Sequence, residues 1–133
     1  MRFEAIKVLS FDCYGTLIDW ESGILTALGP WRARTGLEIA DNELLAAFAR
    51  VEEPLEEQNP TRPYRDLLAR VVLALGQTLG APVTAAEAGA FGASVPDWPA
   101  FPDSAEALAR LKRRAKLVIL SNVDRLSFAG SNQ

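Results

Sequence analysis

Two short apolar runs that each stop at polar side chains constrain the fold of this chain more than any other feature. The first is Ala5–Phe11, which ends at Asp12, and the second is Lys116–Leu120, which ends at Ser121-Asn122. Short apolar runs of this kind are typical of strands buried in a parallel sheet. With the usual right-handed crossover the two strands are parallel, so their polar ends lie at the carboxyl edge, where α/β proteins bind ligands. The sequence therefore predicts an α/β fold with Asp12 and Ser121 at one edge.

The residues between these runs have the apolar spacing of amphipathic helices. Asp19 is the expected N-cap of the first helix, which we expect Gly29-Pro30 to interrupt and Gly36 to end. Asp41 and Pro63 are the expected first residues of the next two helices, since both residue types are favoured at helix starts. Several helices therefore follow the first strand.

A proline and a capping pattern define the rest of this helical part. Pro54 is expected to kink or end the second helix. Thr84 and Glu87 have the spacing of a capping box, which predicts a further helix that runs to about Val95. Residues 20–95, called the helical insert below, are thus predicted to be almost entirely helical.

The segment 96–102 marks a boundary, because it is rich in proline and aromatic residues and lacks helical spacing. Asp103 and Glu106 predict a second capping box, at the start of the helix that leads to the second strand. The order strand, helical insert, helix, strand is that of a split βαβ unit. We therefore expect residues 1–19 and 96–133 to form one body and the helical insert to form another.

The composition excludes several classes of chemistry. The chain has no His, which removes Ser-His triads, His-metal sites and His bases, and its single Cys13 has no partner for an internal disulfide. A net charge of -3 without a basic face argues against nucleic-acid binding. No apolar stretch approaches the roughly 20 residues that span a bilayer, and the first residues lack the form of a signal peptide. We expect a cytoplasmic protein whose chemistry uses carboxylates, hydroxyls, amides, Lys and Arg.

Asp12 is the predicted nucleophile, because a carboxylate held at a strand end among hydrogen-bond donors can form a covalent ester that water later hydrolyses. The turn at Gly15 would bring the hydroxyl of Thr16 back toward Asp12. Ser121 and Asn122 would add donors from the second strand. Turn formation and helix capping are the alternative roles of these residue types. The joint placement of the four residues favours the catalytic interpretation.

Two stretches carry a resemblance to a known family. Phe11-Asp12-Cys13-Tyr14-Gly15-Thr16-Leu17 resembles the first motif of the haloacid dehalogenase superfamily, and Leu120-Ser121-Asn122 resembles its second motif. The helical insert resembles the cap domain that follows the first motif in that superfamily. The resemblance implies a Rossmann-like core, a nucleophilic Asp12, and hydroxyl support from Thr16 and Ser121.

Tyr14 stands where phosphatases of this superfamily typically carry a second Asp, which protonates the leaving alcohol and accompanies the use of magnesium. A phenol is poorly suited to that task because its ordinary pKa is near 10, whereas halide leaves without a proton. The pattern therefore resembles the type II, (S)-2-haloacid dehalogenase branch, which implies a 2-hydroxy acid product and no metal. A Tyr14 ring packed beneath the helical insert is the alternative role. A magnesium-dependent phosphatase is the weaker alternative function.

A 2-haloacid substrate calls for a cation beside its carboxylate, preferably a guanidinium. Arg32 and Arg34 are the expected sources, with Arg50 as a third, although no motif singles out one of them. Cys13 and Tyr14 are also expected to contact the substrate. Three aromatic side chains either wall the pocket or pack as ordinary core: Trp20, Trp31 and Phe48. Helical caps often form dimer contacts, so a homodimer is a further expectation.

The sequence departs from the superfamily after its second motif. Only Val123–Gln133 follow Ser121-Asn122, whereas members of the family carry a catalytic Lys and acidic residues on later strands. We therefore expect a truncated chain, or one that needs a partner to cover the open edges and apolar faces of its strands. A non-catalytic fragment that acts only through association is the alternative to a working hydrolase.

Overall fold

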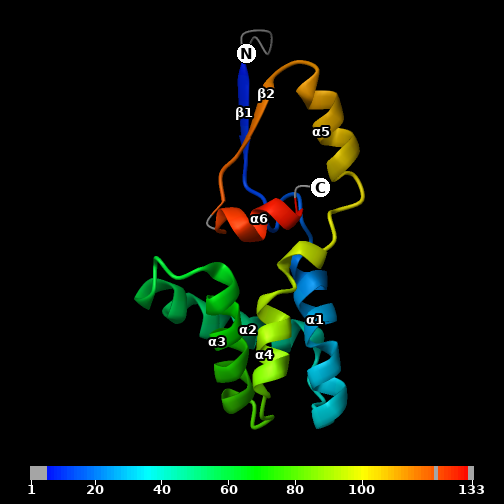
Figure 1. Ribbon diagram of the computed structural model, residues 1–133. Helices are drawn as coiled ribbons and strands as arrows, with labels where there is room; N and C mark the ends of the chain where they lie inside the picture. Colours follow the sequence, from blue (N-terminus) through cyan, green and yellow to red (C-terminus); the bar gives the residue numbers. More distant parts are fainter. Residues whose placement is uncertain (1–5, 122, 132–133) are drawn as a thin grey trace.

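A computed structural model describes residues 6–121 and 123–131 of the chain (Figure 1). Its sheet pairs β1 (Val8–Phe11) with β2 (Lys116–Ile119), and the two strands are parallel, with Val8 opposite Lys116 and Phe11 opposite Ile119. The parallel pairing confirms the α/β prediction. The predicted start of the first strand at Ala5 lies outside the described residues.

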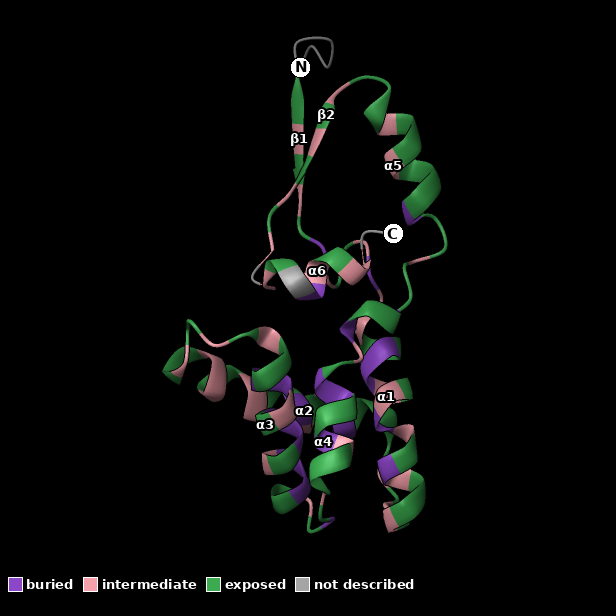
Figure 2. Ribbon diagram, viewed as in Figure 1, coloured by how far each residue is buried: buried purple, intermediate pink, exposed green. Residues whose placement is uncertain are grey.

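The prediction that both strands are buried is wrong. Along β1 and β2, exposed residues alternate with half-buried ones, and Val8 and Val118 are 53% and 43% exposed (Figure 2). Helix α5 (Ser104–Lys112) contacts β2. Among the described elements the sheet consists of this strand pair alone, so each strand has an open edge and apolar side chains in contact with solvent.

The helical insert contains four helices, which lie together at the opposite end of the molecule from the strands (Figure 1). Their bounds are α1, Trp20–Thr35; α2, Asp41–Gln58; α3, Tyr64–Thr78; and α4, Ala85–Gly92. The prediction that Gly29-Pro30 interrupts the first helix is wrong, because Pro30 lies inside α1; Pro54 lies inside α2 and does not end that helix. Leu28 and Trp31, which flank Pro30, are 1% and 2% exposed, so their packing outweighs the roughly 3 kcal/mol that an internal proline costs.

The predicted ends of the first and last of these helices are largely confirmed. The Asp19 carboxylate accepts a hydrogen bond from the backbone N–H of Ser22, and Gly36 ends α1 with a left-handed φ of 66°. Thr84 and Glu87 form the predicted capping box, with both reciprocal bonds present. Helix α4 stops at Gly92 rather than near Val95, because a 3-10 turn over residues 95–97 takes its place.

The apolar core lies mainly within the helical insert (Figure 2). Leu44, Phe48 and Leu68 are fully buried where α2, α3 and α4 meet. Trp31 is also buried, and its indole N–H donates to the carbonyl of Ala81 at 3.1 Å. Trp31 and Phe48 are therefore core residues rather than pocket walls. Among the described residues, no helix combines the length and the apolar character needed to cross a membrane.

Two further helices flank β2 in the sequence, α5 before it and α6 after it. The predicted capping box at the start of α5 is absent, because the backbone of Asp103 is already helical (φ −98°, ψ −10°) and its side chain caps nothing. Helix α6 (Arg125–Ser131) follows β2 and lies between the strands and the insert, beside residues 95–97 (Figure 1). The sequence-based interpretation included no helix here.

Candidate active site

The loop after β1 turns back on itself and presents Asp12. Gly15 has a φ of +93°, a conformation that strongly favours glycine, and its N–H donates to the carbonyl of Ile18 at 2.8 Å. The turn brings the Thr16 hydroxyl to the Asp12 carboxylate, with 3.1 Å between Oγ1 and Oδ2. The two side chains therefore lie close together, as predicted.

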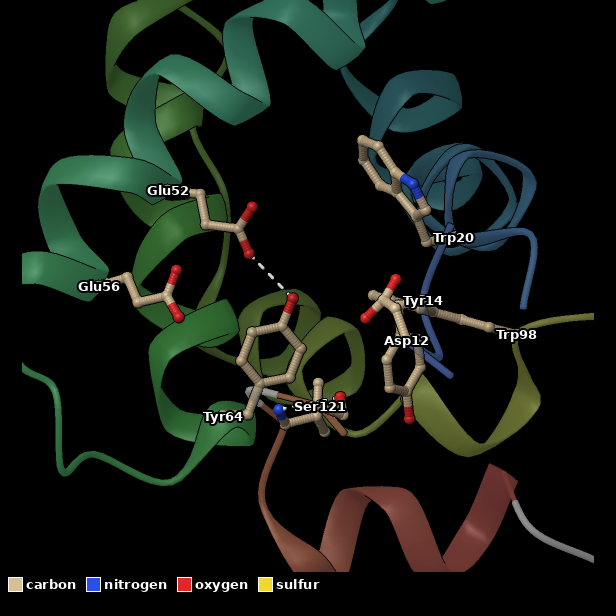
Figure 3. Close-up of a pocket in the computed structure, with 9 residues that line it drawn as sticks. Asp12, Tyr14, Trp20, Glu52, Glu56, Tyr64, Trp98 and Ser121 are labelled. Atoms are coloured by element: carbon tan, nitrogen blue, oxygen red, sulfur yellow. Dashed lines mark hydrogen bonds between the residues drawn. The ribbon is translucent and has the colours of Figure 1, made fainter. Parts of the chain in front are cut away.

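A pocket of about 250 Å³ opens beside Asp12 (Figure 3). Its lining comes from both strand ends, the helical insert and the boundary segment: Asp12, Tyr14, Trp20, Glu52, Glu56, Tyr64, Trp98, Ser121 and Val123. Asp12 and Ser121 thus reach one pocket, as the parallel strand pair requires. The Ser121 hydroxyl accepts a hydrogen bond from the backbone N–H of Val123 at 3.2 Å. Asn122, the fourth predicted catalytic residue, lies outside the described residues.

Tyr14 lines the pocket and also packs against its neighbours. Its phenol oxygen lies 3.0 Å from Ser131 Oγ, and its ring meets Trp98 edge to face at a centroid distance of 5.8 Å. Burial raises the pKa of the Tyr14 phenol above its ordinary value. The Tyr14 side chain is therefore an uncharged part of the pocket lining, held in one orientation by these two contacts.

Cys13 does not line this pocket. Successive side chains in an extended segment point to opposite sides, so Cys13 faces away from the side that Asp12 occupies. It is 3% exposed and belongs to the apolar core, and burial and then the charge of Asp12 raise the pKa of its thiol. The structure does not bring this predicted substrate contact to the pocket.

The three predicted arginines also lie away from the pocket lining. Arg32 pairs with Asp41 at 2.7 Å, and Arg34 pairs with Glu87 at 2.6 Å, both near the C-terminal end of α1. The Arg34 guanidinium, together with the capping bonds at the start of α4, holds the pKa of Glu87 at about 2. Arg50 donates to a backbone carbonyl of its own helix. These arginines support the insert and do not meet Asp12.

Two glutamates and a tyrosine of the pocket were missed by the sequence-based interpretation. Tyr64 donates its hydroxyl to Glu52 at 2.9 Å, and Glu56 lies one helical turn beyond Glu52 on α2 (Figure 3). Burial raises the pKa values of both Glu52 and Tyr64. A signal was available, because Phe48, Glu52 and Glu56 follow one another at four-residue spacing, so the glutamates continue a buried face.

Asp124 joins the insert to the rest of the chain at the edge of this region. Its carboxylate accepts the backbone N–H of Tyr64 at 2.8 Å and that of Ser127 at 3.0 Å. It therefore caps α6 and at the same time contacts the start of α3. Among the described residues, the pocket included, no group of three His, Cys, Asp or Glu side chains is arranged to hold a metal ion.

Comparisons with known proteins agree with this geometry. A family model described as haloacid dehalogenase-like hydrolase matches residues 6–130. A comparison with curated protein sequences found no significant match. Among solved structures, a defluorinating L-2-haloacid dehalogenase is 20% identical with a TM-score of 0.77, and the match covers 94% of this chain and 54% of that one.

A second solved structure, L-2-haloacid dehalogenase from Xanthobacter autotrophicus, is 19% identical with a TM-score of 0.73, and the match covers 94% of this chain and 50% of that one. The same enzyme has been solved with chloropropionic acid covalently bound. At these identities the likeness establishes the fold, and the chain spans about half the length of these structures. Since the family model spans nearly all of the sequence and the strands, loop and helices agree with it, the chain belongs to the haloacid dehalogenase-like hydrolases.

Proposed function

We propose that this chain carries the nucleophile of a hydrolase of the 2-haloacid dehalogenase type, and that Asp12 is that nucleophile. The observation that supports this most directly is the hydrogen bond from Thr16 to Asp12, at the carboxyl end of β1 and in a pocket that Ser121 shares. A bond to one carboxylate oxygen fixes the orientation of the other, which remains available for attack.

In the proposed first step, a carboxylate oxygen of Asp12 attacks the halogen-bearing carbon of an (S)-2-haloacid. A carbon–oxygen bond forms while the carbon–halogen bond breaks, and halide leaves with the electron pair. In the second step a water oxygen attacks the ester carbonyl carbon of Asp12, and the acyl carbon–oxygen bond breaks. The products are a 2-hydroxy acid, halide and one proton, and the Asp12 carboxylate is restored.

Tyr14 fits a reaction whose leaving group needs no proton. Its phenol is held by Ser131 and is buried enough to raise its pKa, so it is a poor acid near neutral pH. Halide leaves as a stable anion, and the scheme uses no metal. The weaker alternative, a magnesium-dependent phosphatase, requires an acid for the leaving alcohol, and Tyr14 stands in the place where one is expected.

The parts of the protein have distinct roles in this proposal. Residues 1–19 and 96–133 supply the nucleophile, Ser121 and Asn122, and residues 20–95 act as a cap that closes the pocket over the substrate. Arg32 and Arg34 are engaged with Asp41 and Glu87, so a role in binding the substrate carboxylate would require them to leave those partners.

Halide release from (S)-2-chloropropionate tests the proposal, with wild-type protein and Asp12→Asn compared side by side. We expect release that disappears in Asp12→Asn, and a single turnover in ¹⁸O-water that places ¹⁸O in Asp12. Folded wild-type protein without halide release would contradict the proposal and favour the non-catalytic alternative. Phosphate release that depends on magnesium would favour the phosphatase instead.

A further inference from the structure

The pocket beside Asp12 has two sides that lie far apart in the sequence. Ser121 and Val123 line it from the end of β2, and Tyr64 lines it from the first residue of α3 (Figure 3). Asp124 directly follows the first of these sides and reaches the second, because its carboxylate accepts the backbone N–H of Tyr64 at 2.8 Å. One side chain therefore links both sides of the pocket.

The start of α3 relies on this carboxylate. Its N-cap residue is Pro63, which makes no side-chain capping hydrogen bond. The first N–H groups of a helix have no partner within the helix, and a negative charge beside them also suits the positive end of the helix dipole. Leu67 and Leu68, one turn further on, are buried, so packing fixes the body of the helix. The Asp124 bond fixes the end of α3 that lines the pocket.

The Asp124 carboxylate is itself held on the side of α6. Its Oδ1 accepts the backbone N–H of Ser127 at 3.0 Å, and its backbone carbonyl accepts that of Phe128 at 3.0 Å, the pattern of an N-cap. Its Oδ2, the atom that meets Tyr64, also accepts the Ser127 hydroxyl at 3.1 Å. The side chain is therefore oriented by α6 at the point where it meets α3.

We infer that Asp124 is a positioning residue, which holds the Ser121 side and the Tyr64 side of the pocket at the separation that binds substrate. The inference rests on the proposed function for the identity of that substrate. Among the described residues that line the pocket Asp124 is not included, so it acts through Tyr64 and leaves the chemistry at Asp12 unchanged. Without the bond a smaller fraction of the molecules has the binding geometry, and the apparent dissociation constant rises in proportion.

Three variants separate the link to Tyr64 from the cap of α6. In Asp124→Ser the new residue is a favoured N-cap that can still accept the Ser127 N–H, but its side chain is too short to reach Tyr64. Asp124→Ala removes both the cap and the link. The matched control is Ser127→Ala, which takes one hydrogen bond from the same carboxylate and leaves the link in place.

The first measurement asks whether the link protects the Tyr64 amide. The chain has two tyrosines, so ¹⁵N-tyrosine labelling gives two backbone amide signals, and Tyr14→Phe identifies the one from Tyr64. We expect this amide to exchange with solvent roughly tenfold faster in Asp124→Ser and Asp124→Ala, because it has no partner within α3. In Ser127→Ala its exchange rate should be that of wild type.

The second measurement is ligand binding, reported by the fluorescence of Trp20 and Trp98, which line the pocket. The probe is (S)-2-chloropropionate. It should bind roughly tenfold more weakly to Asp124→Ser and Asp124→Ala than to wild type, with kcat for halide release within about twofold of wild type. Ser127→Ala should bind the probe as wild type does.

The outcomes separate this inference from the proposed function. Equal exchange of the Tyr64 amide in wild type and Asp124→Ser would overturn the inference, as would a fall in kcat alone or wild-type protein that binds no probe. Halide release with an unchanged dissociation constant in Asp124→Ser would reject the inference and leave the proposed function standing. Weaker binding in Asp124→Ser by a protein that releases no halide would do the reverse.

Discussion

The Thr16 hydroxyl lies 3.1 Å from the Asp12 carboxylate, across a turn that depends on the left-handed φ of Gly15. Both residues are exposed, so the bond contributes little to folding and serves mainly to orient the carboxylate. This separation of roles makes the pair a useful test of the proposed chemistry.

Thr16→Val should lower kcat for halide release by roughly tenfold to a hundredfold, the effect of losing one hydrogen bond to a charged group, with little change in Tm. The measurement is steady-state halide release beside thermal unfolding. Thr61→Val, at an exposed position outside the pocket, is the matched control and should keep full activity. A Thr16→Val variant with wild-type kcat would show that the bond does not orient the nucleophile.

Tyr14 and Ser131 lie far apart in the sequence but share a hydrogen bond of 3.0 Å. Tyr14→Phe should lower the free energy of unfolding by about 1 kcal/mol, because one half-buried hydrogen bond is lost while the ring contact with Trp98 stays. Urea denaturation of wild type, Tyr14→Phe, Ser131→Ala and the double variant gives a complete double-mutant cycle.

The double variant should lose little more stability than either single one, and all three should keep the halide chemistry because the phenol donates no proton. Fully additive losses would mean that the two hydroxyls do not interact. A large fall in kcat for Tyr14→Phe alone would mean that the phenol takes part in the reaction.

Local patterns predicted much of this fold and part of the site. The strand pair, the Thr84–Glu87 capping box and the return of Thr16 to Asp12 all follow from neighbouring residues and regular periodicity. The same rules failed at Pro30, which does not interrupt α1, and Pro54 does not end α2. There the preference of one residue gave way to packing by its neighbours across the insert, which only the assembled helices provide.

The acidic side of the pocket shows a different limit of sequence reasoning. Glu52 and Tyr64 come from different helices, and their bond exists because α2 and α3 pack side by side. Helical spacing places Glu52 on the same face as Phe48, but no local motif says that Tyr64 is the residue it meets. The predicted arginines failed to meet Asp12 for the related reason that nearer carboxylates, Asp41 and Glu87, hold two of them.

Glu52→Gln should change stability in a pH-dependent way. Burial raises the folded-state pKa of Glu52, so its charged form costs stability above that pKa, and the cost vanishes once pH falls below the unfolded value near 4.5. The variant should therefore unfold at a higher Tm than wild type at pH 7, and the gain should shrink toward zero as pH falls below about 4.5. Tm measured from pH 4 to pH 8, with Glu57→Gln as the control, checks this. A variant that is less stable than wild type at pH 7 would show that the buried charge of Glu52 does not destabilise the folded protein.

Glu87→Gln should show the opposite dependence. The Arg34 guanidinium and the capping bonds lower the folded-state pKa of Glu87 to about 2, so its stabilising effect is complete above the unfolded value and is lost as pH falls through about 2. Wild type should therefore be more stable than Glu87→Gln at pH 7, and the difference should shrink progressively below pH 4.5. Because both side chains are accessible to solvent, added salt should also reduce it. Urea denaturation of both proteins from pH 3 to pH 7, at low and high salt, measures the difference. A constant difference across that range would mean that Glu87 acts through its size and capping geometry rather than through its charge.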